Sequence, residues 1–257
     1  MSVLLDVQKL EAFYGAGQVL YGVGFSIRKG EQVALLGRNG MGKTTLLRSL
    51  MGLVADRRGQ IMLHGRDIMR AAPEAIARAG VALVPEGRGV FGSLSVVENL
   101  VMAARPGVDG RRVWTLEKIY ELFPRLHARR TNGGHQLSGG EQQMLTIGRA
   151  LMTNPDLILI DEATEGLAPL VAKDIWTTLG IIRGEGVATV VVDKDFRSLS
   201  RIADRMVMLS KGAVVFDGTP GQLDAATVRA IYGVDEHEID AAESITSTAL
   251  APARAVA

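Results

Sequence analysis

The sequence predicts an α/β fold in which a mostly parallel sheet is flanked by helices. Short apolar runs rich in Val, Ile and Leu occur at residues 32–37, 81–87, 157–163 and 187–193, and each precedes a segment of helical character. A strand that is apolar on both faces is typical of a parallel sheet covered on both sides. The 47% hydrophobic and 22% charged content of the 257 residues are those of an ordinary globular protein.

Three other segments complete the expected architecture. Residues 3–27 alternate apolar and polar side chains and are interrupted by "YGAGQ", which predicts an N-terminal antiparallel β subdomain. The pattern between residues 96 and 130 is helical and Arg-rich, which predicts an inserted helical subdomain at about residues 87–150. Residues 204–218 predict a hairpin with Lys211-Gly212 as its turn.

Composition excludes several classes of protein. The absence of cysteine rules out disulfides, thiolate catalysis and cysteine metal sites, and the net charge of +1 gives no argument for nucleic acid. No run approaches 18 apolar residues, so any membrane role is expected to depend on a partner. Residues 235–257 are acidic and then Ala-rich, with no aromatic residue, so we expect a disordered or marginally helical tail after a domain at 1–234.

The segment "GRNGMGKTT" at residues 37–45 matches G-x-x-x-x-G-K-[ST] between a predicted strand and a predicted helix. Its glycines permit a backbone whose N–H groups point at phosphate oxygens, and the helix N-terminus adds partial positive charge. Lys43 is expected to reach the β- and γ-phosphates, and the Thr44 hydroxyl to ligate Mg²⁺. The alternative is a Gly-rich turn that matches by chance. The candidate nucleotide-binding residues of this loop are Gly37, Arg38, Asn39, Gly40, Gly42, Lys43, Thr44 and Thr45.

The apolar run "LILIDEAT" ends in two adjacent carboxylates. Asp161, at the end of the strand, suits a contact to Mg²⁺. Glu162 would then orient and deprotonate a water in line with the γ-phosphate, which makes it a candidate catalytic residue together with Lys43. The alternative is a buried strand that simply ends in polar residues.

The segment "LSGGEQQMLTIGRAL" at residues 137–151 predicts a helix that begins beside two glycines. Ser138 can cap this helix, while Gly139 and Gly140 leave the first N–H groups bare. We therefore expect an anion from outside the chain to bind this helix start, because no anion of its own chain is apparent.

These three motifs, in this order, resemble the nucleotide-binding subunit of an ABC transporter over residues 3–233. The resemblance implies that two such subunits pair head to tail, with each ATP between the P-loop of one and the signature motif of the other. It places Ser138, Gly139 and Gly140, with Glu141 beside them, at the γ-phosphate bound on the other subunit.

The resemblance also assigns roles to four further positions. Tyr14 matches the aromatic residue that stacks on adenine, the alternative being a strand aromatic packed in the core. Glu86 stands where the family usually has a glutamine that touches Mg²⁺, and residues 165–167 match the loop that crosses the dimer interface. Lys194 stands where most of the family has a histidine at the γ-phosphate. We expect Lys194 to make that contact as a point charge, the alternative being a surface lysine.

The stretch "VPEGRGVFGSLSVVENL" at residues 84–100 resembles one branch of the family, the shorter ATPase subunit of branched-chain amino acid importers, whose relatives move amides and urea. This implies an ATP-hydrolysing subunit on the cytoplasmic face of the inner membrane, bound to a second ATPase subunit, identical or paralogous, and to two transmembrane permease subunits. A periplasmic solute-binding protein would act indirectly, and nucleic acid would take no part. Two alternatives remain: a soluble ABC ATPase of translation or DNA repair, and a nucleotide-gated clamp that barely hydrolyses ATP.

Overall fold

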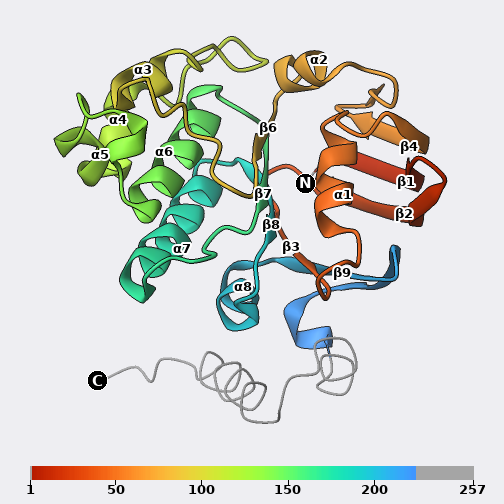
Figure 1. Ribbon diagram of the computed structural model, residues 1–257. Coiled ribbons are helices and arrows are strands. Elements are labelled where there is room, and N and C mark those ends of the chain that lie inside the picture. The colour runs from red at the N-terminus through yellow and green to blue at the C-terminus, as the bar shows by residue number, and fades with distance from the viewer. Residues whose placement is uncertain (1, 224–257) are drawn as a thin grey trace, which may run out of the picture.

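The computed structural model describes residues 2–223, so the predicted tail at 235–257 lies outside the described residues. Within this part the chain forms two sheets that face each other across helix α1 (Lys43–Leu50) (Figure 1). The predicted fold class is confirmed.

The smaller sheet is antiparallel and has the order β2-β1-β4-β5. β1 (Val3–Tyr14) and β2 (Gly17–Arg28) form the predicted N-terminal hairpin, with Tyr14 opposite Gly17. β4 (Asp56–Leu63) pairs with β1, and the short β5 (Arg66–Asp67) pairs with β4. The sequence analysis missed these two strands, which follow α1 and return the chain to the first sheet.

The larger sheet has the order β10-β9-β3-β8-β7-β6 and is parallel except at β10. Four strands lie in the predicted apolar runs: β3 (Gln32–Leu36), β6 (Val81–Val84), β7 (Leu157–Asp161) and β8 (Ala188–Val192). The other two, β9 (Arg205–Ser210) and β10 (Ala213–Gly218), form the predicted hairpin. The predicted turn between the last two is present, with positive φ at Lys211 (47°) and Gly212 (77°), as a two-residue hairpin loop requires.

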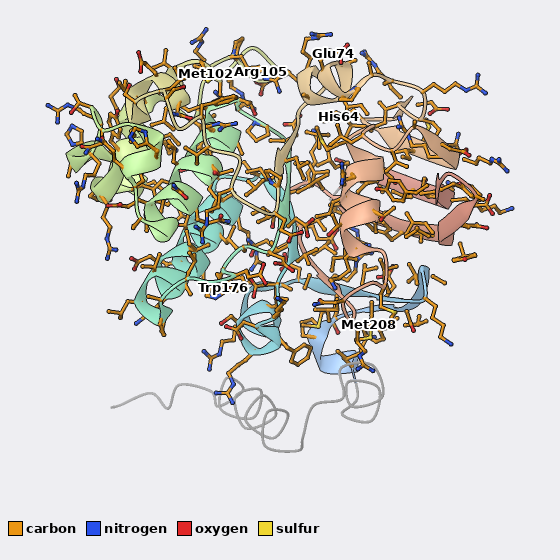
Figure 2. The ribbon with its side chains drawn as sticks, in the orientation of Figure 1. His64, Glu74, Met102, Arg105, Trp176 and Met208 are labelled. Carbon is orange, nitrogen blue, oxygen red and sulfur yellow. The ribbon has the colours of Figure 1, made fainter. Side chains whose placement is uncertain are left out.

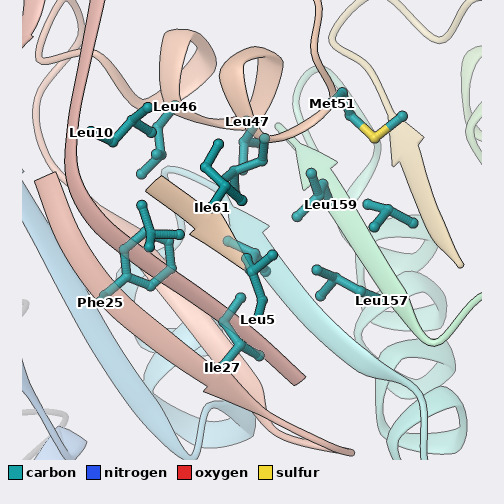
Figure 3. Packing of buried hydrophobic residues seen from close by; sticks show 14 of the residues in the cluster. Leu5, Leu10, Phe25, Ile27, Leu46, Leu47, Met51, Ile61, Leu157 and Leu159 are labelled. Carbon is teal, nitrogen blue, oxygen red and sulfur yellow. The ribbon is translucent and has the colours of Figure 1, made fainter. Parts of the chain in front are cut away.

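The parallel strands are apolar on both faces because they separate two hydrophobic clusters. Leu157 and Leu159 point into the cluster shared with α1 and the antiparallel sheet, whereas Ile158 and Ile160 point into the cluster under the other helices. Figure 3 shows the first cluster, where Leu46 and Leu47 of α1 pack toward the antiparallel sheet. Successive strand residues thus alternate between two cores, which fixes the register and aligns the carboxyl ends of the strands.

The remaining helices are α2 (Pro73–Arg78), α3 (Val96–Val101), α4 (Leu116–Leu122), α5 (Pro124–Ala128), α6 (Gly139–Met152), α7 (Pro169–Gly184) and α8 (Phe196–Ile202). Helices α3 to α6 gather on the side of the parallel sheet away from the antiparallel sheet (Figure 1) and fall within the predicted helical segment, apart from the last two residues of α6. The Arg105 guanidinium donates to the Ala77 carbonyl, and in Figure 2 Arg105 and Glu74 of α2 lie at the same edge of the molecule. No helix within residues 2–223 is long and apolar enough to cross a membrane.

Candidate nucleotide site

The loop between β3 and α1 has a backbone that depends on glycine. Gly37 has a φ of 140°, and a Cβ at this position would lie 2.5 Å from the Leu209 carbonyl oxygen. Gly42 has a φ of 98°, and its Cβ would meet Leu20 of β2 at 2.9 Å. Side chains are excluded on both sides of the loop, so its N–H groups remain accessible around the start of α1.

Lys43 occupies the first turn of α1 and folds over this loop. Its Nζ donates to the carbonyls of Gly37 (2.6 Å) and Arg38 (3.0 Å). Burial lowers the pKa of Lys43, the charge of Asp161 raises it and Lys194 lowers it further. An ammonium group held by carbonyls alone, without an ion pair among residues 2–223, is available to a phosphate.

Most of the candidate site residues line two adjoining cavities. A cavity of about 400 Å³ is lined by Gly37, Arg38, Asn39 and Lys43 from the loop and by Glu162 and Lys194 from the ends of β7 and β8. The neighbouring cavity, of about 430 Å³, is lined among others by Gly40, Gly42, Thr44, Thr45, Glu86 and Asp161. The structure therefore brings the P-loop, both strand-end carboxylates, Glu86 and Lys194 around one space.

Asp161 is 3% exposed at the end of β7, and its Oδ1 has no hydrogen-bond partner among the described residues. Burial raises the pKa of its carboxyl group, a hydrogen bond from Thr44 lowers it, and the nearby charge of Glu86 raises it. A buried carboxylate with an unused oxygen beside a hydroxyl is the oxygen-rich environment that Mg²⁺ prefers. The residues present fit a magnesium ion.

Glu162 follows Asp161 with a left-handed backbone, φ 56°, which is a strained conformation for glutamate. Its Oε2 is buried without a partner among the described residues, and its Oε1 lies 4.0 Å from the Lys194 Nζ. One carboxylate oxygen from each of Glu86, Glu162 and Glu165 lies within 4.8 Å of the others. Three carboxylates this close repel one another, so a cation between them is stabilising.

Lys194 is that cation within the chain. Its Nζ donates to the Glu165 carboxylate, and this hydrogen bond raises the pKa of Lys194, with further support from Glu165, Asp193 and Glu86. Lys194 lines the cavity beside the P-loop, but its side chain is 58% exposed, so the alternative of a surface lysine stays open. Its expected contact to the γ-phosphate stays a prediction.

Asp193 was missed by the sequence analysis although it ends a buried strand. Its carboxylate accepts hydrogen bonds from the Thr164 N–H (2.7 Å), the Thr164 hydroxyl (2.8 Å) and the Asp195 N–H (2.9 Å). Asp193 therefore ties the segment after β7 to the segment after β8 and sets Glu165 beside Lys194. The available signal was the position of a carboxylate at the end of an apolar run.

The signature segment begins α6 with a capping box. The Glu141 carboxylate accepts from the Ser138 N–H (2.8 Å), and the Ser138 hydroxyl accepts from the Glu141 N–H (3.3 Å). The expectation that this helix start has no anion of its own chain is therefore wrong, because Glu141 supplies one. The Gly139 and Gly140 N–H groups still precede any helical acceptor. Ser138 to Glu141 line neither cavity beside the P-loop.

Tyr14 ends β1 and is 49% exposed, so packing in the core is excluded. Its side chain lines neither of the two cavities beside the P-loop. The expected stacking of Tyr14 on adenine stays a prediction.

Comparison with known proteins decides the family. The family model described as ABC transporter matches residues 20–165. The chain belongs to the ABC transporter family. It is 40% identical over 221 residues to the high-affinity branched-chain amino acid transport ATP-binding protein BraG of Pseudomonas aeruginosa, covering 86% of this chain and 94% of BraG. It is 35% identical over 242 residues to the lipopolysaccharide export system ATP-binding protein LptB of Acidithiobacillus ferridurans, covering 93% of this chain and all of LptB.

Solved structures agree with this assignment. An ATP-binding subunit of an ABC transporter superposes with a TM-score of 0.76 at 28% identity, covering 95% of this chain and 99% of that one. A dimeric ATP-binding cassette in a post-hydrolysis state with ADP and Pi superposes with a TM-score of 0.71 at 25% identity, covering 84% and 99%. This cassette is thus the ATP-binding subunit of an ABC transporter, an ATPase whose hydrolysis of ATP powers transport. ABC ATPases of this kind dimerise and pair with permease subunits.

Proposed function

We propose that this cassette powers the import of branched-chain amino acids or related amides. The observation that supports this most is the 40% identity to BraG over nearly the whole of both chains. In this proposal the cassette pairs with a second copy or a paralogue and sits on two permease subunits at the cytoplasmic face of the inner membrane. A periplasmic binding protein delivers the solute to the permease.

The geometry supports a division of labour at the P-loop. Lys43 exchanges the two carbonyls it now contacts for phosphate oxygens. Thr44 and Asp161, with Glu86 beside them, would hold Mg²⁺, which neutralises charge on the phosphates. Glu162, with its unused buried Oε2, accepts the proton of the attacking water, and Lys194 faces the same cavity as a cation for the γ-phosphate.

Binding in trans completes the proposed site. Ser138, Gly139 and Gly140 lie away from the cavities of their own P-loop, which supports their use on a nucleotide held by the partner. The Gly139 and Gly140 N–H groups, at the start of a 14-residue helix, suit a γ-phosphate, with the Ser138 hydroxyl beside them.

The rate of ATP hydrolysis distinguishes an ATPase from a nucleotide-gated clamp that barely hydrolyses ATP. Steady-state phosphate release from the full chain should be lost in Glu162→Gln and retained in Glu121→Gln, a matched exposed glutamate on α4. ATP binding should survive in both variants. Equal turnover in Glu162→Gln and the unaltered chain would overturn the assignment of the base.

Lipopolysaccharide export is the second candidate, because the 35% identity to LptB extends over the whole of LptB. Purifying the tagged cassette from detergent-solubilised membranes and identifying its permease chains separates the candidates. Permeases of an amino acid importer, together with loss of leucine uptake when the cassette is deleted, support the proposal. Export permeases and undiminished uptake would replace it with the second candidate, and ribosomes or DNA without any permease would favour a soluble ABC ATPase.

A further inference from the structure

The Arg88 side chain packs against Gly139 at the start of α6, the signature helix. A Cβ added to Gly139 would lie 2.6 Å from Nη1, 2.9 Å from Nη2 and 2.9 Å from Cζ of Arg88, so the guanidinium covers the space that this glycine leaves free. The same Nη2 lies 3.9 Å from the Cβ position of Gly166, in the segment after β7. One guanidinium therefore stands between two loops that carry proposed nucleotide or interface residues.

The backbone of Arg88 is held there at a cost. Its φ is 67°, a left-handed conformation that is rare for arginine. The Thr146 hydroxyl donates to the Arg88 carbonyl, and the Arg149 Nη1 donates to the next carbonyl, that of Gly89, at 2.6 Å. Thr146 and Arg149 belong to the second half of α6, so α6 itself fixes the backbone at Arg88 and Gly89.

The charge of Arg88 is not matched inside the chain. No carboxylate of residues 2–223 lies within ion-pair distance of its guanidinium. It also lies beside the positive end of the α6 dipole, where a second positive charge is unfavourable unless an anion lies between them. Strain and unmatched charge at one point indicate a ligand with negative charge.

We propose that Arg88 is a nucleotide-contact residue that acts in trans, its guanidinium joining the signature N–H groups on the γ-phosphate of ATP held by the partner cassette. The proposal rests on the proposed function, in which the signature works in trans. A planar guanidinium can donate two parallel hydrogen bonds to phosphate oxygens, which suits a terminal phosphate better than the bridging ones.

The test uses the full chain with Glu162→Gln, which retains ATP. Arg88→Met is compared with Arg88→Lys, with Arg112→Met as a matched exposed arginine, and with Ser138→Arg. Titrating fluorescent ATP onto dilute monomer measures the affinity of the P-loop for ATP. Analytical ultracentrifugation at increasing ATP concentration measures dimer closure. Arg88→Met should raise the ATP concentration for half-maximal closure about tenfold or more, the effect of one charge-assisted hydrogen bond.

The control variants, ADP and a mixing experiment test whether the effect depends on the Arg88 charge, on the γ-phosphate and on the partner chain. Arg88→Lys should fall between the parent and Arg88→Met, Arg112→Met should match the parent, and monomer affinity should stay within about twofold in all of them. With ADP, which lacks the γ-phosphate, Arg88→Met and the parent should behave alike. Mixing Arg88→Met chains with Lys43→Ala chains should restore one intact composite site. The mixture should therefore close at a lower ATP concentration than Arg88→Met alone, and Lys43→Ala alone should not close.

Each contrary result has a defined meaning. If Arg88→Met closes at the parent's ATP concentration while Ser138→Arg does not, Arg88 only packs on Gly139 and the proposed function stands. If Ser138→Arg also closes normally, or the parent does not close with ATP, the trans arrangement itself fails. If the mixture needs as much ATP for closure as Arg88→Met alone, Arg88 does not act in trans.

Discussion

Replacing Asp161 by asparagine should stabilise the nucleotide-free cassette. The carboxylate is 3% exposed, its Oδ1 has no partner among residues 2–223, and Glu86 adds repulsion. Asparagine has nearly the same shape, keeps an oxygen for the Thr44 hydroxyl and removes the charge. The site is thus built for a cation at the expense of the stability of the empty chain.

The asparagine amide still lacks a partner at that position, so the gain is the difference between a charged and a neutral unpartnered group, about 1–3 kcal/mol. At about 2–4 °C per kcal/mol for a domain of this size, Asp161→Asn should raise Tm by several degrees. Burial raises the pKa of Asp161, so the folded state binds this proton more tightly than the unfolded state does. Ionised Asp161 therefore lowers the free energy of unfolding, by nothing below its unfolded pKa and by more as pH rises through its folded pKa. The stabilisation by Asp161→Asn is accordingly largest at alkaline pH and smaller at acidic pH.

Urea denaturation in EDTA at pH 8 and pH 5 measures this difference in unfolding free energy. Asp174→Asn is the matched control, because Asp174 is half-exposed and lies 3.5 Å from Arg125, and it should change stability by no more than about 0.5 kcal/mol. Adding MgATP should stabilise the unaltered chain more than Asp161→Asn. An Asp161→Asn chain less stable than the unaltered one in EDTA at pH 8 would refute the reasoning, since it would mean that Lys43 already compensates the charge.

Four further substitutions, at three positions, test the remaining assignments. Lys194→Ala should slow phosphate release far more than it weakens ATP binding, because charge at the γ-phosphate matters most in the transition state, and turnover equal to the unaltered chain would leave Lys194 only its ion pair with Glu165. Lys194→His should restore turnover with a new pH dependence near neutrality, whereas the raised pKa of Lys194 keeps the lysine charged there; a flat profile would contradict this. Ser138→Arg should block ATP-dependent closure at unchanged monomer affinity, which light scattering and nucleotide titration measure together. Asp193→Ala should lower the unfolding free energy by about 1–3 kcal/mol, because the Thr164 N–H and hydroxyl lose their acceptor, and an unchanged urea midpoint would exclude that role.

The sequence alone was sufficient to predict the elements that are determined by contiguous residues. Apolar runs such as 157–161 and 188–192 are recognisable because both faces of each strand are buried, and the P-loop because its glycines, Lys43 and Thr44 are contiguous. Asp161 and Glu162 could be placed beside that loop because parallel strands end at one edge of a sheet.

What the sequence did not reveal depends on contacts between distant segments. β4 was missed because its partner is β1, on the other side of α1 in the chain, and three of its first five residues are exposed charged or polar side chains. Arg88 was missed because its neighbours, Gly139 and Gly166, belong to other loops, and nothing in "PEGRG" indicates which loop its side chain reaches. The capping role of Glu141 was available from the S-x-x-E spacing and was overlooked in favour of the bare glycines.

The two faces of the cassette carry opposite charges that the chain itself matches only in part. Around the P-loop, Asp161 has an unused oxygen and Glu86, Glu162 and Glu165 crowd together, so this face is stabilised by cations. At the signature helix, Arg88 stands at the positive end of a dipole and has no ion-pair partner among residues 2–223, so this face is stabilised by an anion. The two faces of one chain do not compensate each other's charge, because the start of α6 lines neither cavity beside its own P-loop. In the proposed head-to-tail pair, MgATP presents its metal to the first face and its γ-phosphate to the second, so one ligand relieves both and closure is driven by nucleotide. Hydrolysis separates the γ-phosphate from the rest of the nucleotide, and with it the link between the two faces.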